Sequence, residues 1–171
     1  MHPLVELARS AVENYAASGT EIAVPLDFPK EFLDKKAGVF VTIEKGKELR
    51  GCIGTYLPCY QNVAEETICN AISAAVQDYR FGPIEKEELP HLSFTVYILG
   101  EPKLVQRQKE LDPKKYGVIV KSSDRKRTGL LLPDLKGVDA VTDQVSIACA
   151  KAGIDPAEPI TLYKFTVEKY Q

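Results

Sequence analysis

Residues 38–56 read GVFVTIEKGKELRGCIGTY and predict a β-hairpin. The run 38–44 is rich in apolar and β-branched residues, and residues 47–56 return as a second strand-like run. Lys45-Gly46 lies between them and predicts a turn, since glycine tolerates the positive φ angles that short hairpin turns require. An antiparallel pair of strands is therefore the starting point of the expected fold.

Amphipathic helices are expected on both sides of this hairpin. Residues 3–17 carry apolar side chains at helical spacing, and Gly19 is a suitable stop. After the hairpin, Asn62 with Glu65 resembles a capping box and starts a helix that runs to about Tyr79.

Further strands follow from alternating apolar residues. The runs with this pattern or with strand composition are 92–99, 117–122, 128–132 and 160–169. A last helix, from Val141 to Ala152, is closed by Gly153. We therefore expect an α+β fold: a mostly antiparallel β-sheet of about six strands with flanking helices, in one domain covering residues 1–171. The long connections between hairpins leave room for a smaller lobe.

Composition excludes some classes of function. Lys plus Arg number 22 and Asp plus Glu 24, a formal charge of −2 without the basic surplus typical of nucleic-acid binders. The longest uncharged apolar stretches fall far short of the about 20 residues that span a membrane. The start of the chain lacks the pattern of a signal peptide, so we expect a cytoplasmic protein.

The cysteines do not predict a metal site. Cys52, Cys59, Cys69 and Cys149 include no pair at the two- to four-residue spacing typical of structural zinc sites, and a disulfide framework is not expected in the cytoplasm. Nothing in the sequence calls for an organic cofactor either. Cys69 and Cys149 are expected to be small core residues on helices.

The segment 49–55, LRGCIGT, is the main candidate for a functional site. Strand alternation places Arg50, Cys52 and Gly54 on one face. The positive charge of Arg50, about 7 Å along the strand, would lower the pKa of a solvated Cys52 thiol and favour the nucleophilic thiolate. The alternative is a tight hairpin strand whose glycines serve packing and whose arginine sits in an ion pair.

Two further places could complete such a site. A cysteine nucleophile needs a base, and His91 is the only internal histidine, although a histidine beside a proline is more often an exposed loop residue. Arg80 and Phe81 follow the long helix. Arg80 is either a second guanidinium facing an anionic ligand near Arg50, or a cation that offsets the helix dipole while Phe81 anchors the loop. The charged run 124–127 is interpreted as a solvated hairpin tip.

Five strings carry a resemblance to a known family: LRGCIGT (49–55), DYRF (78–81), EELPHL (87–92), GLLLPDL (129–135) and KAGI (151–154). Together they make nearly the whole chain resemble the AMMECR domain family. The resemblance implies an α+β fold with an antiparallel sheet and a smaller subdomain. The family's hallmark motif falls on Leu49 to Thr55, its arginine-phenylalanine pair on Arg80 and Phe81, and its Glu-Leu-Pro step on residues 88–90. Gly82-Pro83 and residues 137–139 depart from the family's pattern.

The resemblance also supplies candidate partners. Free-standing microbial members resemble protein A of the AmmeMemoRadiSam system, whose other members are a Memo-like protein and a radical-SAM protein. Gly51, Gly54 and Thr55 of the motif join Arg80, Phe81 and His91 as candidate binding residues.

Two functions remain open at this point. One is an enzyme or enzyme accessory that acts on a small or peptidic anionic substrate with Cys52 and Arg50 at its centre. The other is a non-catalytic module that docks the Memo-like or the radical-SAM protein through the motif surface, with Arg50 and Arg80 as anchors.

Overall fold

A computed structural model describes residues 1–171, and the chain divides into two compact units. Unit 1 comprises Met1–Leu99 and Glu168–Gln171, and unit 2 comprises Gly100–Val167. Unit 2 is thus an insertion within unit 1. Where the chain enters and leaves unit 2, the Gly100 N–H donates to the carbonyl oxygen of Thr166 at 2.8 Å.

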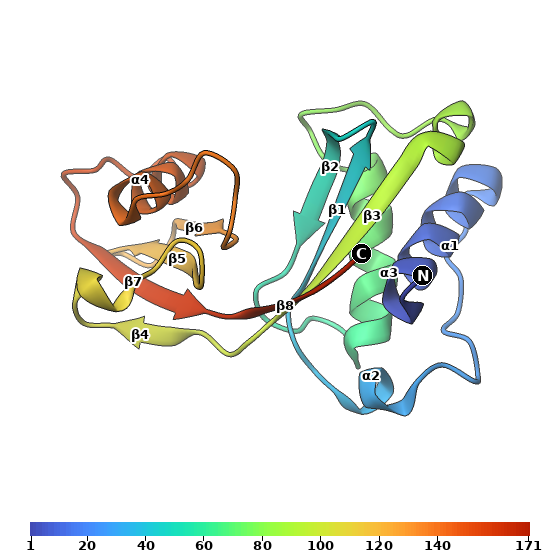
Figure 1. The fold of residues 1–171 in the computed structure, drawn as a ribbon, viewed down its shortest axis with the longest axis horizontal. Helices are drawn as coiled ribbons and strands as arrows, with labels where there is room; N and C mark the ends of the chain where they lie inside the picture. The colour runs from blue at the N-terminus through green and yellow to red at the C-terminus, as the bar shows by residue number, and fades with distance from the viewer. The chain divides into compact units, whose positions relative to one another are not determined.

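Unit 1 is built on a four-stranded sheet with the order β2-β1-β3-β8 (Figure 1). Its strands are β1 Val39–Lys45, β2 Glu48–Gly54, β3 Leu92–Leu99 and β8 Val167–Tyr170. β1 pairs antiparallel with both β2 and β3. The predicted hairpin is confirmed, with Gly46 and Lys47 at its turn and both at positive φ.

Helices cover one face of this sheet. They are α1 Pro3–Ser18, the short α2 Lys30–Asp34 and α3 Val63–Val76, and the 3-10 helix η1 Lys86–His91 precedes β3. α1 ends at Gly19, whose φ is +71°, and the side chain of Asn62 caps α3 by accepting from the Glu65 N–H at 2.9 Å. Val41 and Ile43 of β1 are fully buried in the core shared with α1 and α3.

Unit 2 has its own sheet, with the order β4-β7-β5-β6, and its own core. Its elements are β4 Lys103–Val105, the 3-10 helix η2 Gln108–Glu110, β5 Gly117–Ser122, β6 Thr128–Leu131, α4 Val141–Lys151 and β7 Ile160–Phe165. The paired strands β4·β7, β5·β6 and β5·β7 are all antiparallel. Val118, Val120, Ala148 and Cys149 are at the centre of this core.

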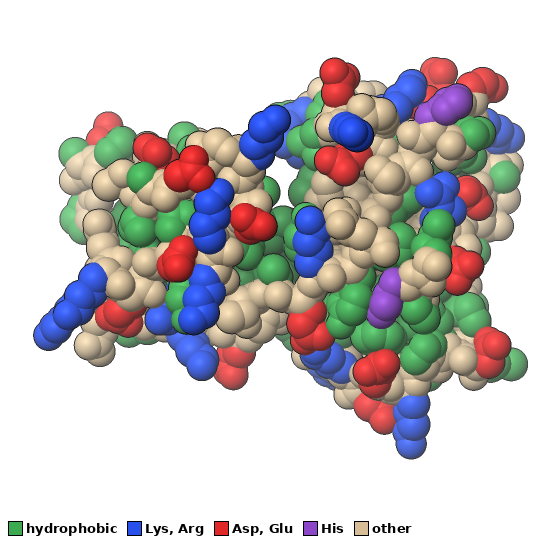
Figure 2. Space-filling view, in the orientation of Figure 1, with side chains coloured by type: hydrophobic (Ala, Val, Ile, Leu, Met, Phe, Trp, Pro, Cys, Tyr) green, Lys and Arg blue, Asp and Glu red, His purple; other side chains and the backbone are tan.

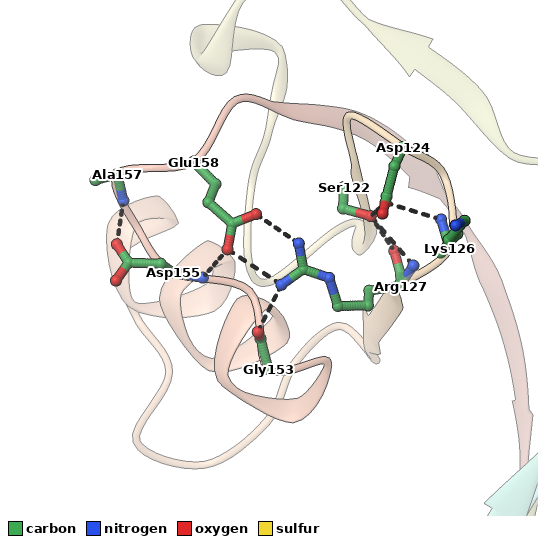
Figure 3. A network of polar contacts seen from close by, with 8 residues as sticks. All are labelled: Ser122, Asp124, Lys126, Arg127, Gly153, Asp155, Ala157 and Glu158. Carbon is green, nitrogen blue, oxygen red and sulfur yellow. Dashed lines mark hydrogen bonds and ion pairs between the residues drawn. The ribbon is translucent and has the colours of Figure 1, made fainter.

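Polar contacts join the β5–β6 turn of unit 2 to the segment that follows α4 (Figure 3). The guanidinium of Arg127 donates to both carboxylate oxygens of Glu158, at 3.1 and 2.5 Å, and to the carbonyl oxygen of Gly153 at 2.8 Å. Residues 124–126 of the expected hairpin tip are exposed, whereas Arg127 is half-buried and paired with Glu158. Because Glu158 lies 31 residues along the chain from Arg127, the local sequence pattern could not predict this ion pair.

The α+β class is confirmed, with eight strands in two sheets where about six were expected. The predicted strand 160–169 is interrupted at Thr166, and its two parts, β7 and β8, belong to different sheets. Alternation continues across the interruption through Phe165 and Val167, so the pattern alone gives no sign of the change. β4 is three residues long, too short to leave a periodic signal.

The face of the molecule seen in Figure 2 carries interspersed acidic and basic side chains, without a broad area of either sign. None of the helices combines the length and apolar character needed to cross a membrane.

Candidate functional site

The motif strand β2 contains an irregularity at Arg50. In its pairing with β1, Glu44 is opposite Leu49 and Ile43 is opposite Gly51, so Arg50 is an extra residue on β2. This bulge breaks the strict alternation that placed Arg50 and Cys52 on one face. Beyond it, Cys52 pairs with Thr42.

The two glycines of the motif allow close packing. A Cβ atom on Gly51 would lie 2.2 Å from the carbonyl oxygen of Ala74 in α3, and one on Gly54 would lie 2.3 Å from the ring of Phe40. The backbone of α3 and an aromatic ring therefore occupy the space that a side chain would need at these positions.

The guanidinium of Arg50 donates from all three of its nitrogens to groups within the protein. Its Nε and Nη2 donate to the two carboxylate oxygens of Glu88 at 2.9 and 2.8 Å. Its Nη1 donates to the carbonyl oxygen of Gly82 at 2.9 Å, and Nη2 also donates to that of Pro83 at 3.1 Å. The Arg50 and Glu88 side chains are only 16% and 15% exposed. Arg50 therefore ties the loop after α3 and the helix η1 to the motif strand.

This pairing affects the carboxyl group. The hydrogen bonds from Arg50 lower the pKa of Glu88 to about 2, with further help from the Glu85 N–H and from Lys45. Asp78 shows the same effect: the guanidinium of Arg80 is the main cause that lowers its pKa to about 2, and the N–H groups of Cys52 and Arg80 add to it. Both carboxylates are ionised in the native protein at neutral pH.

Asp78 and Arg80 together bind the backbone of Cys52 on the open edge of the sheet. The Cys52 N–H donates to Oδ2 of Asp78 at 2.9 Å, and Nη2 of Arg80 donates to the Cys52 carbonyl oxygen at 3.4 Å. Arg80 also donates to Asp78 through Nε at 2.9 Å and Nη2 at 2.7 Å. The pair thus takes the place of a neighbouring strand at this residue and protects the edge.

The cluster around the motif includes Arg50, Cys52, Arg80 and Phe81 but not His91. The ring of Phe81 lies near both guanidinium groups, with its centroid 6.0 Å from Cζ of Arg50 and 5.5 Å from that of Arg80. His91 is exposed at the end of η1, and none of the cluster's hydrogen bonds, ion pairs or ring contacts involves it. The half-buried Cys52 receives a hydrogen bond at Sγ from the hydroxyl of Thr42 at 3.2 Å.

Sequence reasoning missed the residues that hold and flank this cluster. Asp78 and Glu88 were not identified as the partners of the two arginines, because each pairing depends on a loop whose path the sequence pattern does not define. Tyr79, which is 96% exposed between Asp78 and Arg80, was not among the candidate binding residues either. A large aromatic residue just past the end of an amphipathic helix, beside an arginine, was the available signal.

Thr55 belongs to a separate buried polar cluster. Its hydroxyl donates to Oε1 of Glu66, a fully buried carboxylate, and accepts from Asn70 at 3.3 Å. The other Glu66 oxygen accepts from the N–H groups of Cys59 and Tyr60, both at 2.9 Å. Thr55 therefore supports the loop that leads into α3.

The expectation for the helical cysteines is half right. Cys149 is buried in the core of unit 2, whereas Cys69 is only half-buried. A hydrogen bond with the Cys69 side chain is the main cause that raises the pKa of Tyr60 to about 12. Burial raises the pKa of the Cys69 thiol.

Two pockets lie elsewhere in unit 1. One, of about 280 Å³, lies between α1 and residues 22–29, and the other, of about 400 Å³, is open and polar and is lined by Lys36 and residues 59–61 and 65. No group of three or more His, Cys, Asp or Glu residues is placed to hold a metal ion.

Comparisons with known proteins agree with the fold. The AMMECR1 family model matches residues 5–170. A protein of Thermotoga maritima is 48% identical over 99% of this chain and 98% of its own length. Protein CA_C1420 of Clostridium acetobutylicum is 46% identical over 99% of this chain, which spans only 36% of that relative. The crystal structure of the uncharacterized protein PH0010 from Pyrococcus horikoshii superposes with a TM-score of 0.89 at 38% identity, covering 97% of this chain and 88% of that one. The chain belongs to the AMMECR1 family.

Proposed function

We propose that the protein is a non-catalytic binding module that docks another protein through residues 78–81, here called the 78–81 surface. The observation that carries this proposal is the exposure of Tyr79, at 96%, on a loop that Asp78 and Arg80 fasten to the motif strand. An aromatic side chain held on a fixed backbone loses little conformational freedom on binding.

The chemistry of the 78–81 surface suits a protein partner. Tyrosine and arginine are the side chains most enriched, with tryptophan, among residues that dominate interface energies. The Arg80 side chain is 42% exposed, and its Nη1 has none of the guanidinium's hydrogen bonds, which come from Nε and Nη2. We infer a partner that offers a carboxylate to Nη1 and an apolar recess to the ring of Tyr79.

The hydrogen bonds that Arg50 makes within the protein support docking over catalysis. An anion-binding arginine needs free donors, whereas four of the five N–H groups of this guanidinium already donate to Glu88 or to a carbonyl oxygen, which leaves one N–H on Nη1. Arg50 thus supports the 78–81 surface indirectly, through the loop that follows it.

The family resemblance implies two partners, the Memo-like and the radical-SAM proteins of the AmmeMemoRadiSam system. We propose that one of these two proteins binds the 78–81 surface, and that the binding takes place in the cytoplasm. A pull-down with each purified protein tests it. We expect Tyr79→Ala to lose the partner and Cys52→Ser to retain it. If both variants bind like the wild type, or if neither protein binds the wild type, the proposal is wrong.

One observation favours the second candidate, an enzyme that uses Cys52. The Thr42 hydroxyl donates to Sγ, as it would to a thiolate. Iodoacetamide labelling across pH, followed by mass spectrometry of each cysteine, tests this candidate. Labelling of Cys52 at a lower pH than the exposed Cys59 would support a thiolate mechanism, and a Cys52 that resists labelling in the folded protein would exclude it.

A further inference from the structure

A groove on the side of unit 1 runs between α1 and the segment that follows it. After α1 the chain turns back and continues to α2 (Figure 1). The groove has a volume of about 280 Å³, and its apolar lining includes Leu7, Ile22 and Phe28 together with three prolines. It shares no residue with the 78–81 surface.

Local sequence explains how the groove forms. Its α1 wall consists of residues 3, 6, 7 and 10, which share one face of a helix. Its other wall contains a turn in which the Phe28 N–H donates to the Pro25 carbonyl oxygen at 3.1 Å. Pro25 and Pro29, with their fixed φ angles, stiffen this wall, so the groove is largely preformed.

The groove is acidic as well as apolar. Glu6 and Asp27 line it, and neither carboxylate takes part in any of the protein's hydrogen bonds or ion pairs. No lysine or arginine lines it. Arg9, the one basic residue of α1, is used elsewhere: it donates to the Leu92 carbonyl oxygen at 2.7 Å and its guanidinium lies over the ring of Phe94.

Leu26 is an exposed apolar residue between Pro25 and Asp27, which both line the groove. It lies in the turn between Pro25 and Phe28, and its side chain is fully exposed, at 105%. A leucine that nothing in the protein covers, next to a groove with an apolar lining, adds to the apolar area that a partner would bury.

We propose that this groove binds an extended segment of a partner protein in which a lysine or arginine side chain stands next to an apolar one. The apolar side chain would pack on Leu7, Ile22 and Phe28, and the cation would lie between Glu6 and Asp27. A volume of about 280 Å³ is at the lower end of the range for ligand pockets and can hold one or two side chains of such a segment. The site is independent of the proposed docking at Tyr79.

The test uses the full chain, labelled with ¹⁵N, and three acetylated, amidated tripeptides: leucine–arginine–leucine, leucine–glutamine–leucine and leucine–glutamate–leucine. We expect the arginine peptide, at millimolar concentration, to shift amide resonances of residues 4–10 and 22–29. The glutamine peptide should bind several-fold more weakly, and the glutamate peptide should give no shifts. Higher salt should weaken the binding of the arginine peptide, because its ion pairs with Glu6 and Asp27 would be exposed to solvent.

Variants locate the site. Glu6→Gln and Asp27→Asn should each weaken binding of the arginine peptide about three-fold, the size expected for one exposed ion pair. Glu101→Gln, an exposed acid of unit 2, is the matched control and should leave binding unchanged. Both groove residues are exposed, so the variants should fold, and their circular dichroism spectra check this.

Three results would overturn the proposal: equal binding of the arginine and glutamine peptides, shifts outside the groove, or no shifts at 10 mM peptide (about the weakest binding worth assigning). Shifts that depend on protein concentration without peptide would assign the groove to a second copy of the chain instead.

Discussion

Replacing Gly51 with alanine tests whether the motif glycine exists for packing. The new Cβ atom would lie 2.2 Å from the carbonyl oxygen of Ala74 and 3.1 Å from its carbon. Ordinary van der Waals contact begins near 3.4 Å, so the two backbones would have to separate by about 1.2 Å. Neither can move freely, because Gly51 is paired with Ile43 in the sheet and Ala74 is buried within α3.

The expected cost follows from comparable core substitutions. Overpacking a well-packed core costs about 1–3 kcal/mol, and a clash between two backbones belongs at the upper end. Replacing glycine by alanine also restricts the unfolded chain, which offsets about 0.4–1 kcal/mol. Gly82→Ala is the matched control, since nothing lies within 4 Å of its Cβ position and its φ is not positive. Comparing the two variants cancels most of the unfolded-state effect.

Urea unfolding followed by circular dichroism measures the difference. We expect Gly51→Ala to be about 3 kcal/mol less stable than Gly82→Ala, with a Tm lower by about 6–12 °C for a chain of this size. If the two variants have equal stability, the close approach of α3 to the motif strand is not a constraint on this residue, and the packing explanation fails.

Three further predictions concern stability. Because the pKa values of Asp78 and Glu88 are lowered to about 2, their ion pairs stabilise the protein above about pH 4.5, and this contribution, on the order of 2 kcal/mol each, is lost as the pH falls toward 2. Glu88→Gln should therefore lower stability at pH 7 and flatten the loss between pH 4.5 and 2 in urea titrations, and an unchanged acid profile would contradict this. Thr55→Val removes a donor to the buried Glu66 and should cost about 1–3 kcal/mol by the same measurement, and a cost near zero would show that Glu66 does not need it. We propose that residues 1–171 form one domain and expect a single transition in calorimetry, since β8 completes the unit 1 sheet after the chain has passed through unit 2; two separate transitions would refute this.

The local elements of the fold could be predicted from the sequence because their signals lie within a few residues of each other. The hairpin turn at Gly46, the helix stop at Gly19 and the cap at Asn62 each depend on a single residue type with a known backbone preference. The division of the chain into two sheets depends instead on which strands pair with each other in the folded protein. The residues around Thr166, where the chain passes from one sheet to the other, have no sequence pattern that indicates this change.

The candidate site was predicted in part. The motif strand was singled out because two glycines in a strand require an explanation, and α3 and Phe40 supply it. An ion pair at Arg50 was one of the two alternatives for the motif, but its partner Glu88, 38 residues away, could not be inferred, because the pairing depends on the tertiary path of the loop between α3 and β3. Residues that serve long-range contacts and residues that serve binding look alike in one sequence.

The proposed function requires that the 78–81 surface binds a partner protein and that the Cys52 thiol is not needed for this binding. Isothermal titration calorimetry of the wild type, Tyr79→Ala and Cys52→Ser against the purified Memo-like and radical-SAM proteins tests it most directly. For at least one of them, we expect Tyr79→Ala to raise Kd by about 30-fold, the effect of losing a side chain worth about 2 kcal/mol, while Cys52→Ser stays within about two-fold of the wild type. A Kd unchanged by Tyr79→Ala, or raised as much by Cys52→Ser, would contradict the account.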